Sequence, residues 1–146
     1  MVLRGFRMYG LIAGIVAIVA VVVITLYLVT GFGQQDRGAL ARKTVQTYWG
    51  DLHRGHTRAA YNLLSSGTQY ARPFNQYNQD MFGFLTQTGG VSARVGKPQV
   101  HGDRALAPVA LLFVQANRPL NGYQHLFWED GSWRIVDQNG GITQTK

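Results

Sequence analysis

Residues 104–136 read RALAPVALLFVQANRPLNGYQHLFWEDGSWRIV and decide the fold class of this 146-residue chain. The run Arg104–Gln115 is rich in valine, leucine and phenylalanine at the length of a strand, and the shorter runs Tyr123–Trp128 and Trp133–Asp137 have the same character. An Asp-Gly pair separates the last two runs and favours a tight hairpin turn, because these residues accept positive φ angles. The stretch therefore predicts three consecutive antiparallel strands.

The residues just before this stretch predict a fourth strand. Val91, Ala93 and Val95 alternate with polar residues, and Gly102-Asp103 supplies a turn into the run that follows. Pro108 interrupts the longest run, and because proline cannot donate to a strand ladder, it predicts an edge position or a bulge there.

Further upstream the apolar residues change to helical spacing. Ala41, Val45, Tyr48 and Leu52 recur at i, i+4, i+7 and i+11, which predicts a helix over residues 39–53. A short second helix is expected to start at Thr57 and to end at Ser65-Ser66-Gly67, and a third is expected to have Pro73 in its first turn and to stop at Gly89-Gly90. Three helices followed by about four strands predict an α+β domain with helices packed on one face of a curved antiparallel sheet.

The amino-terminal residues predict a transmembrane helix over residues 11–30. Leu11–Val29 is a run of 19 residues interrupted only by Gly14 and Thr25. A helix of that length spans about 28 Å, close to the ~30 Å hydrocarbon core of a bilayer. The run is long for a secretory signal and lacks a good cleavage site, so an uncleaved signal anchor is favoured over a secreted protein released by cleavage.

Charge around this helix predicts its orientation and the remaining organisation. Residues 1–10 carry two arginines and are expected to be a short cytoplasmic tail, with the bulk of the chain extracytoplasmic at the cell membrane. Residues 31–38 are glycine-rich and predicted to be a linker, residues 39–138 the domain, and residues 139–146 a tail.

Composition excludes several classes of function. With no cysteine, the chain has no disulfide framework, thiolate metal site or cysteine nucleophile. The formal net charge is +7, but the basic residues are scattered singly, which argues against nucleic-acid binding. Arg37, Arg42 and Lys43 follow the predicted membrane helix and are placed to attract anionic lipid head groups or a wall polymer.

Two sequence motifs resemble parts of NTF2-like domains. YWGDLHRG at residues 48–55, followed by AAYNLLS at residues 59–65, is similar to the opening helix pair of these domains, and LFWEDGSWRIV at residues 126–136 is similar to their closing hairpin. The resemblance covers residues 39–138, and the nearest kin are small membrane-anchored or secreted bacterial members, lumazine-binding-like domains among them. It implies a cone-shaped half-barrel whose sheet curls around the long helix.

The resemblance leaves the function open, because this architecture hosts isomerases, dehydratases, ligand carriers and structural modules. Many relatives have Gly-Asp where this chain has Gly55-His56, so any role of that aspartate in the relatives cannot be assigned to this chain. A cone that performs catalysis needs a general base and a hydrogen-bond donor that stabilises the developing charge of an oxyanion. The sequence shows no recognisable set of residues of this kind. The possible pocket residues are Tyr48, His53, Tyr61, Tyr77, Asp103 and His125.

No metal, cofactor or nucleotide site is predicted. His101 and His125 are candidates to face each other on neighbouring strands, but two imidazoles without a placed carboxylate are a weak metal signal. The glycine pairs do not match a phosphate-binding loop.

The sequence thus favours a membrane-anchored, non-catalytic interaction or assembly module that works as an accessory subunit of a membrane complex or as a homodimer. Trp128, just before the hairpin tip, is a possible interface residue together with Arg37, Arg42 and Lys43. The alternative is a cone that binds a small hydrophobic ligand or performs simple acid-base catalysis.

Overall fold

A computed structural model describes residues 37–116, 118–137 and 142–144 of the chain. The predicted cytoplasmic tail and the predicted transmembrane helix lie outside these residues. Within the described part, no helix has both the length and the hydropathy needed to cross a bilayer.

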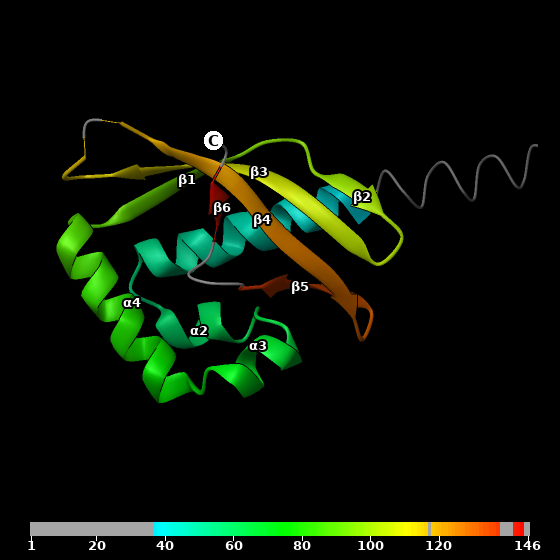
Figure 1. The fold of residues 1–146 in the computed structure, drawn as a ribbon, viewed down its shortest axis with the longest axis horizontal. Helices are drawn as coiled ribbons and strands as arrows, with labels where there is room; N and C mark the ends of the chain where they lie inside the picture. Colours follow the sequence, from blue (N-terminus) through cyan, green and yellow to red (C-terminus); the bar gives the residue numbers. More distant parts are fainter. Residues whose placement is uncertain (1–36, 117, 138–141, 145–146) are drawn as a thin grey trace, which may run out of the picture. The chain divides into compact units, whose positions relative to one another are not determined.

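Four helices precede the strands in the described residues, as Figure 1 shows. The first is described over residues 37–53, so that it already includes the last two residues of the predicted linker. It is followed by α2 (Thr57–Tyr61), α3 (Ser66–Ala71) and α4 (Phe74–Thr88). The strands are β1 (Val91–Val95), β2 (Gln99–His101), β3 (Arg104–Phe113), β4 (Leu120–Glu129), β5 (Ser132–Val136) and β6 (Thr143–Gln144). The α+β class with a curled antiparallel sheet is confirmed, but the described residues form four helices and six strands where three helices and about four strands were predicted, because α3, β2 and β6 were missed.

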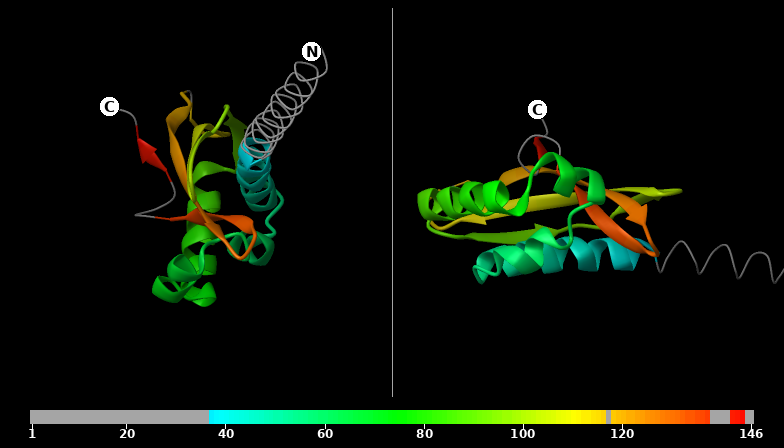
Figure 2. Two further views of the ribbon diagram at one scale, coloured as in Figure 1. Left: turned by 90° about the vertical axis from the view of Figure 1, so that its right-hand side faces the viewer. Right: turned by 90° about the horizontal axis from the view of Figure 1, so that it is seen from below.

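The sheet is built around the two long strands β3 and β4. Strands β1 and β2 both pair with β3 on one side, and β5 and β6 both pair with β4 on the other, all antiparallel. The 37–53 helix runs along one side of this sheet, and α2, α3 and α4 gather at one end of it (Figures 1 and 2). Each edge of the sheet thus consists of two short strands along one long strand, an arrangement that suits a sheet that curls.

Alternation along the strands divides the sheet into two faces. Ala105, Ala107, Val109 and Leu111 of β3 are all buried, and the residues between them are less so. We call the buried side the inner face, which packs against the helices, and the other side the outer face. The helical spacing read from the sequence is confirmed, because the four apolar residues of the first helix form part of the same core, namely Ala41, Val45, Tyr48 and Leu52.

Pro108 lies in a central strand, so of the two predicted alternatives the edge position was wrong. The other, a bulge, agrees with the pairing beside it, where residues 96–98 stand opposite residues 107–108. Pro108 pairs with Tyr123 of β4 on one side, and on the other it lies where β1 has ended and β2 has not yet begun. There the Pro108 carbonyl oxygen accepts a hydrogen bond of 2.8 Å from the Gly96 nitrogen. The sheet tolerates the proline because its missing N–H coincides with the break between the two edge strands.

The predicted end of the second helix was also wrong. The helix α2 stops at Tyr61, and Ser65 instead caps the following helix α3, with its side chain accepting a hydrogen bond from the Thr68 nitrogen. Leu64 forms an isolated bridge with Ile135 of β5, and this connection between distant segments ends the helix early. Pro73 is the N-cap of α4, one residue before the first turn where it was expected.

Candidate functional site

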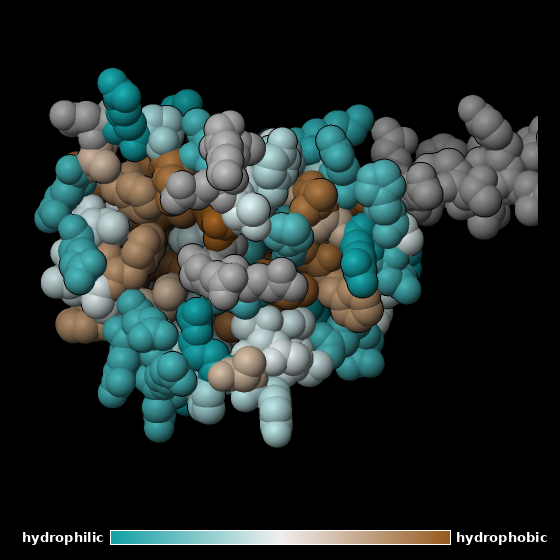
Figure 3. All heavy atoms as spheres, viewed as in Figure 1, coloured by the Kyte–Doolittle hydropathy of each residue, from teal (hydrophilic) through white to brown (hydrophobic). Residues whose placement is uncertain are grey.

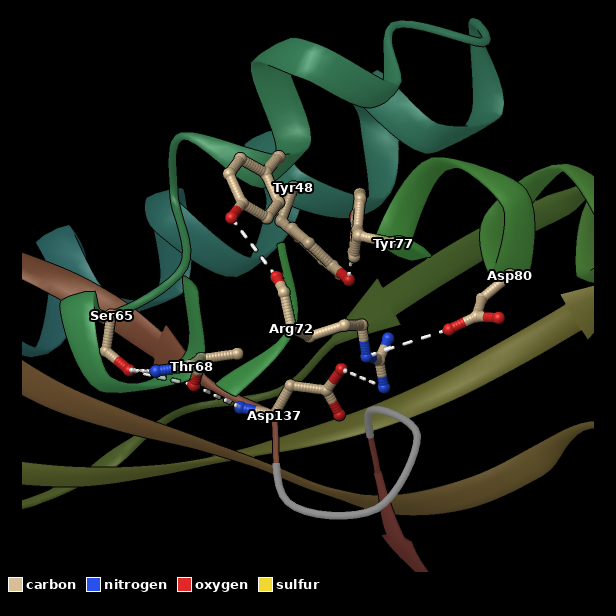
Figure 4. Close-up of polar contacts among 8 residues, drawn as sticks. Tyr48, Ser65, Thr68, Arg72, Tyr77, Asp80 and Asp137 are labelled. Carbon is tan, nitrogen blue, oxygen red and sulfur yellow. Dashed lines mark hydrogen bonds and ion pairs between the residues drawn. The ribbon is translucent and has the colours of Figure 1, made fainter. Parts of the chain in front are cut away.

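A buried ion pair joins the helical layer to the sheet. Arg72 lies between α3 and α4, and Asp137 directly follows β5. The Arg72 Nη2 atom is 3.0 Å from Asp137 Oδ2, and the aspartate side chain is only 2% exposed. The Arg72 Nε atom also lies 3.8 Å from Asp80 Oδ2, so the guanidinium reaches carboxylates of two elements (Figure 4).

Local sequence explains how Arg72 reaches the core. A residue that precedes proline is pushed out of the helical region, and Arg72 accordingly has an extended backbone (φ −133°, ψ 95°) and ends α3. On the other side of the pair, the backbone nitrogen of Asp137 donates to Thr68 Oγ1 at 3.3 Å. The same threonine takes part in the cap with Ser65, so the capping motif of α3 also positions the aspartate.

Two buried tyrosines lie beside this pair. The hydroxyl of Tyr77 donates to the hydroxyl of Tyr48 at 3.2 Å, and both side chains are fully enclosed (Figure 4). Burial raises the pKa of Tyr48 well above its ordinary value and raises the pKa of Tyr77 to about 12. Asp137 raises and Arg72 lowers the pKa of both phenols, so all four groups interact electrostatically. At neutral pH both tyrosines are hydrogen-bond donors and neither is a base.

Gln124 adds an unsatisfied amide to the same face. It is completely buried on β4, and neither Oε1 nor Nε2 has a hydrogen-bond partner among the described residues. His125 pairs with Val136, so extending that register by one residue sets Gln124 beside Asp137 on the inner face. The Arg72 Nη1 atom is likewise buried without a partner. We call Tyr48, Arg72, Tyr77, Gln124 and Asp137 the core polar cluster.

The core polar cluster is better suited to holding a polar group than to acid-base catalysis. Its carboxylate is engaged by a guanidinium, and its phenols bond to each other. A general base needs a pKa near the working pH, whereas the raised pKa values of the two phenols keep them protonated there. The unpaired amide of Gln124 and the unpaired guanidinium nitrogen can serve a small polar guest or ordered water.

A second feature lies on the outer face of the sheet. A groove of about 520 Å³ crosses β2, β3, β4 and the end of β5, and it is open to solvent. Figure 3 shows hydrophobic residues exposed over the end of the sheet where β2, β3 and β4 lie, with hydrophilic residues around them. We call this feature the outer groove; it is lined by Gln99, His101, Arg104, Ala105, Leu106, His125, Leu126, Phe127 and Val136.

The six predicted pocket residues do not form one site. Tyr48, Tyr61 and Tyr77 lie together, because Tyr77 bonds to Tyr48 and its ring is 5.2 Å from that of Tyr61. However, the Tyr61 hydroxyl lies 3.1 Å from the carbonyl oxygens of both Gln69 and Arg72, which gives it a structural role at the end of α3.

The other three predicted pocket residues lie elsewhere. His53, at the end of the first helix, has its Nδ1 atom 2.8 Å from the Val91 carbonyl oxygen. Asp103 is in the turn between β2 and β3, where its Oδ1 atom is 3.8 Å from Arg37. His125 belongs to the outer groove and bonds to Thr143 at 3.1 Å.

The possible interface residues also separate. Trp128 points to the inner face, where its ring meets that of Trp133 at 5.1 Å and the Arg37 guanidinium lies 4.4 Å from its centroid. Arg37 is therefore occupied by the domain itself. Arg42 and Lys43 are exposed on the first helix and remain accessible.

His101 and His125 both line the outer groove, but β3 lies between their strands. Across the described ranges, no three histidine, aspartate or glutamate side chains are grouped so that they could hold a metal ion.

Sequence reasoning missed Arg72, Gln124 and Asp137. A signal for two of them was present, because Gln124 and Asp137 continue the alternation of the inward residues Leu126 and Ile135. A polar residue at an inward position of a strand therefore indicates a candidate site residue. Only the Arg-Pro step pointed to Arg72, and it does not indicate a direction for the side chain.

Neither a protein-family model nor a curated protein matches the sequence. Among solved structures, an NTF2-like protein of Campylobacter jejuni, provisionally assigned as a transpeptidase, superposes with a TM-score of 0.50 and 17% identity, covering 64% of this chain and 94% of its own. A protein of Kribbella flavida, provisionally assigned as a ketosteroid isomerase, superposes with a TM-score of 0.49 and 17% identity. The match covers 75% of this chain and 82% of that protein. An NTF2-like protein of unknown function from Cytophaga hutchinsonii superposes with a TM-score of 0.44 and 14% identity. The match covers 66% of this chain and 86% of that protein. The likeness to the Campylobacter jejuni protein, at 17% identity, shows the fold alone and leaves the activity open.

Proposed function

We propose that this chain, which has the NTF2-like fold, is a membrane-anchored, extracytoplasmic interaction module that docks on a protein partner through the outer face of its sheet. It acts as an accessory subunit of a membrane assembly and performs no catalysis. The observation that carries the proposal is the exposure of large apolar side chains on that face, where Tyr123 is 37% and Phe127 is 42% exposed. Exposed aromatic residues on one face of a sheet are typical anchors of protein interfaces.

The anchored location is supported by the sequence alone. The apolar run Leu11–Val29 has the length of a membrane span, and the two arginines before it favour a cytoplasmic amino terminus. The kinship with membrane-anchored, lumazine-binding-like bacterial members is part of the same proposal. Arg42 and Lys43 are exposed, which supports a contact with anionic head groups near the anchor.

The absence of catalysis is supported by the chemistry of the core polar cluster. Its charged groups pair with each other, and its tyrosines are held protonated. Such a cluster stabilises one arrangement of the core without offering a group to abstract or deliver a proton at neutral pH.

Membrane extraction and crosslinking test the proposal. The full chain is expected to stay in the pellet after alkaline carbonate washing and to crosslink into a species larger than one chain. Substituting Tyr123→Ser together with Phe127→Ser is expected to abolish the larger species, while Tyr70→Ser, which alters a 92% exposed tyrosine of α3, leaves it intact. Release by carbonate, or an intact mass lacking about 31 residues, identifies a secreted protein instead. A strictly monomeric chain refutes the module.

A second candidate function, binding of a small molecule within the cone, is favoured by one observation. Gln124 has two buried amide atoms and Arg72 has one buried nitrogen without partners in the described part of the chain. Leaving such groups unpaired costs about 1–3 kcal/mol each, so a polar guest that satisfies them would be stabilising. Native mass spectrometry of the chain extracted from its own membranes would then show a bound small molecule that is lost in Gln124→Leu. Identical masses for both proteins, after correction for the substitution, contradict this second candidate.

A further inference from the structure

We infer that the outer groove binds a short acidic segment of a partner protein, with apolar side chains of that segment on the groove floor and its carboxylates at the rim. This inference rests on the proposed docking function and specifies the chemistry of the partner. It draws on the shape, the floor and the charge of the groove.

The floor of the outer groove has apolar side chains from three strands, with His125 between two of them. Leu106 of β3, Phe127 of β4 and Val136 of β5 all point to the outer face. The registers explain their proximity, because His125 pairs with Leu106 on one side and with Val136 on the other. The 42% exposure of Phe127 leaves its ring available to a partner side chain.

The charge of the outer groove is positive, because Arg104 is one of its lining residues. His101, Arg104 and His125 are among its nine lining residues, and none of the nine is a carboxylate. The neighbouring acids are engaged elsewhere: Asp103 approaches Arg37 at 3.8 Å, and Glu129 accepts hydrogen bonds from Ser66. Arginine presents a fork that matches a carboxylate, so charge complementarity favours an acidic occupant.

The shape of the outer groove favours a protein segment over the other occupants. A small acidic molecule such as a fatty acid needs a site that encloses most of its surface, whereas this groove is open to solvent. A second copy of the chain would bring the same arginine, Arg104, to a shared interface, where the two like charges repel each other. A peptide segment leaves its solvent side exposed and contributes carboxylates between apolar residues.

Fluorescence anisotropy with labelled seven-residue peptides tests this inference on the full chain in detergent. The probes are an alternating glutamate-leucine peptide, the matching lysine-leucine peptide and the matching glutamate-serine peptide. We expect saturable binding of the first and at least tenfold weaker binding of the other two. Arg104→Gln and Phe127→Ser are each expected to weaken the first at least tenfold, while Arg94→Gln and Tyr70→Ser, which alter exposed residues outside the groove, leave it unchanged.

Several outcomes overturn the inference. They are absence of saturable binding of the glutamate-leucine peptide, equal binding of the lysine-leucine peptide, and equal loss in the control variants. Thermal unfolding of each variant identifies a loss caused by misfolding, and Arg104→Gln then decides, because it removes an exposed charge without altering the floor. If analytical sedimentation shows dimers, and the groove variants dissociate them, the occupant of the groove is a second copy of the chain. That result also refutes the acidic partner. Crosslinking to a partner that survives Arg104→Gln refutes the partner chemistry but leaves the docking function standing, whereas a monomeric chain refutes both.

Discussion

The Arg72 guanidinium and the Asp137 carboxylate approach to 3.0 Å, linking the end of α3 to the end of β5. They are 65 positions apart in the sequence, and the aspartate side chain is almost fully enclosed. An ion pair this deep constrains the packing of helices on the sheet, since each charge needs the other.

We predict that Arg72→Met destabilises the domain by about 3 kcal/mol, because it leaves a buried carboxylate without its guanidinium. Chemical denaturation measures this loss. The double variant Arg72→Met with Asp137→Leu is expected to be more stable than the single variant, since it removes both charges. The exposed Arg94→Gln serves as the control and is expected to change stability by less than about 0.5 kcal/mol. A single variant as stable as the control contradicts the prediction.

The buried tyrosine pair predicts a loss of stability in alkali. Burial raises the pKa of Tyr77 from its ordinary value of 10.0 to about 12, and that of Tyr48 is raised as well. A raised folded pKa means that the unfolded chain loses its proton first, so the contribution to stability is complete below about pH 10 and declines as the pH rises toward the folded value. We expect the free energy of unfolding to fall over this interval and to fall less steeply in Tyr77→Phe.

Absorbance titration of the phenolates checks the same pair directly. Wild type should have two tyrosines whose pKa is raised above the ordinary value of 10.0, that of Tyr77 to about 12, and Tyr48→Phe should have one such tyrosine. Ionisation of all tyrosines close to the ordinary value, in a chain that is still folded, is the contrary result.

A surface contact predicts the opposite dependence on pH. The Ser66 nitrogen donates to Glu129 Oε2 at 3.1 Å and its hydroxyl donates to Oε1, and these bonds lower the pKa of Glu129 below its ordinary value of 4.5. A lowered folded pKa gives stability that is present above the ordinary value and lost as the pH falls through the folded value. The stability difference between wild type and Glu129→Gln should therefore be largest near neutrality and should shrink in acid. A difference that is constant with pH contradicts this assignment.

Arg37 is predicted to contribute to folding, in addition to its position beside the predicted anchor. Its carbonyl oxygen accepts a 2.8 Å hydrogen bond from Trp133 Nε1, and its guanidinium lies 4.4 Å from the centre of the Trp128 ring. We expect Arg37→Ala to cost about 0.5–1 kcal/mol, as for an exposed cation-aromatic contact, and Arg42→Ala to have no effect. Denaturation of the two variants in parallel makes the comparison. If the Arg37→Ala and Arg42→Ala variants are equally stable, Arg37 makes no contribution to folding and the prediction is wrong.

Alternation along the closing hairpin accounts for which of its residues face outward. The exposed position of Phe127 follows from alternation with the inward residues Leu126 and Trp128, and the hairpin after them follows from Asp-Gly. For the same reason, an outward Trp128 was never compatible with an inward Trp133 directly opposite it in the hairpin. Predicting the core polar cluster required knowledge of which strand end meets which helix end, and no local pattern contains that information.

The sequence by itself determined the order of helices and strands, the fold class and the apolar run at the amino terminus, because hydrophobic period, turn residues and run length are local properties. Only the tertiary structure decided that Ser65 begins a helix, that Pro108 belongs to a central strand, and that Arg72 meets Asp137. The physical reason is that a backbone break or a buried charge becomes tolerable only when a distant segment supplies its partner.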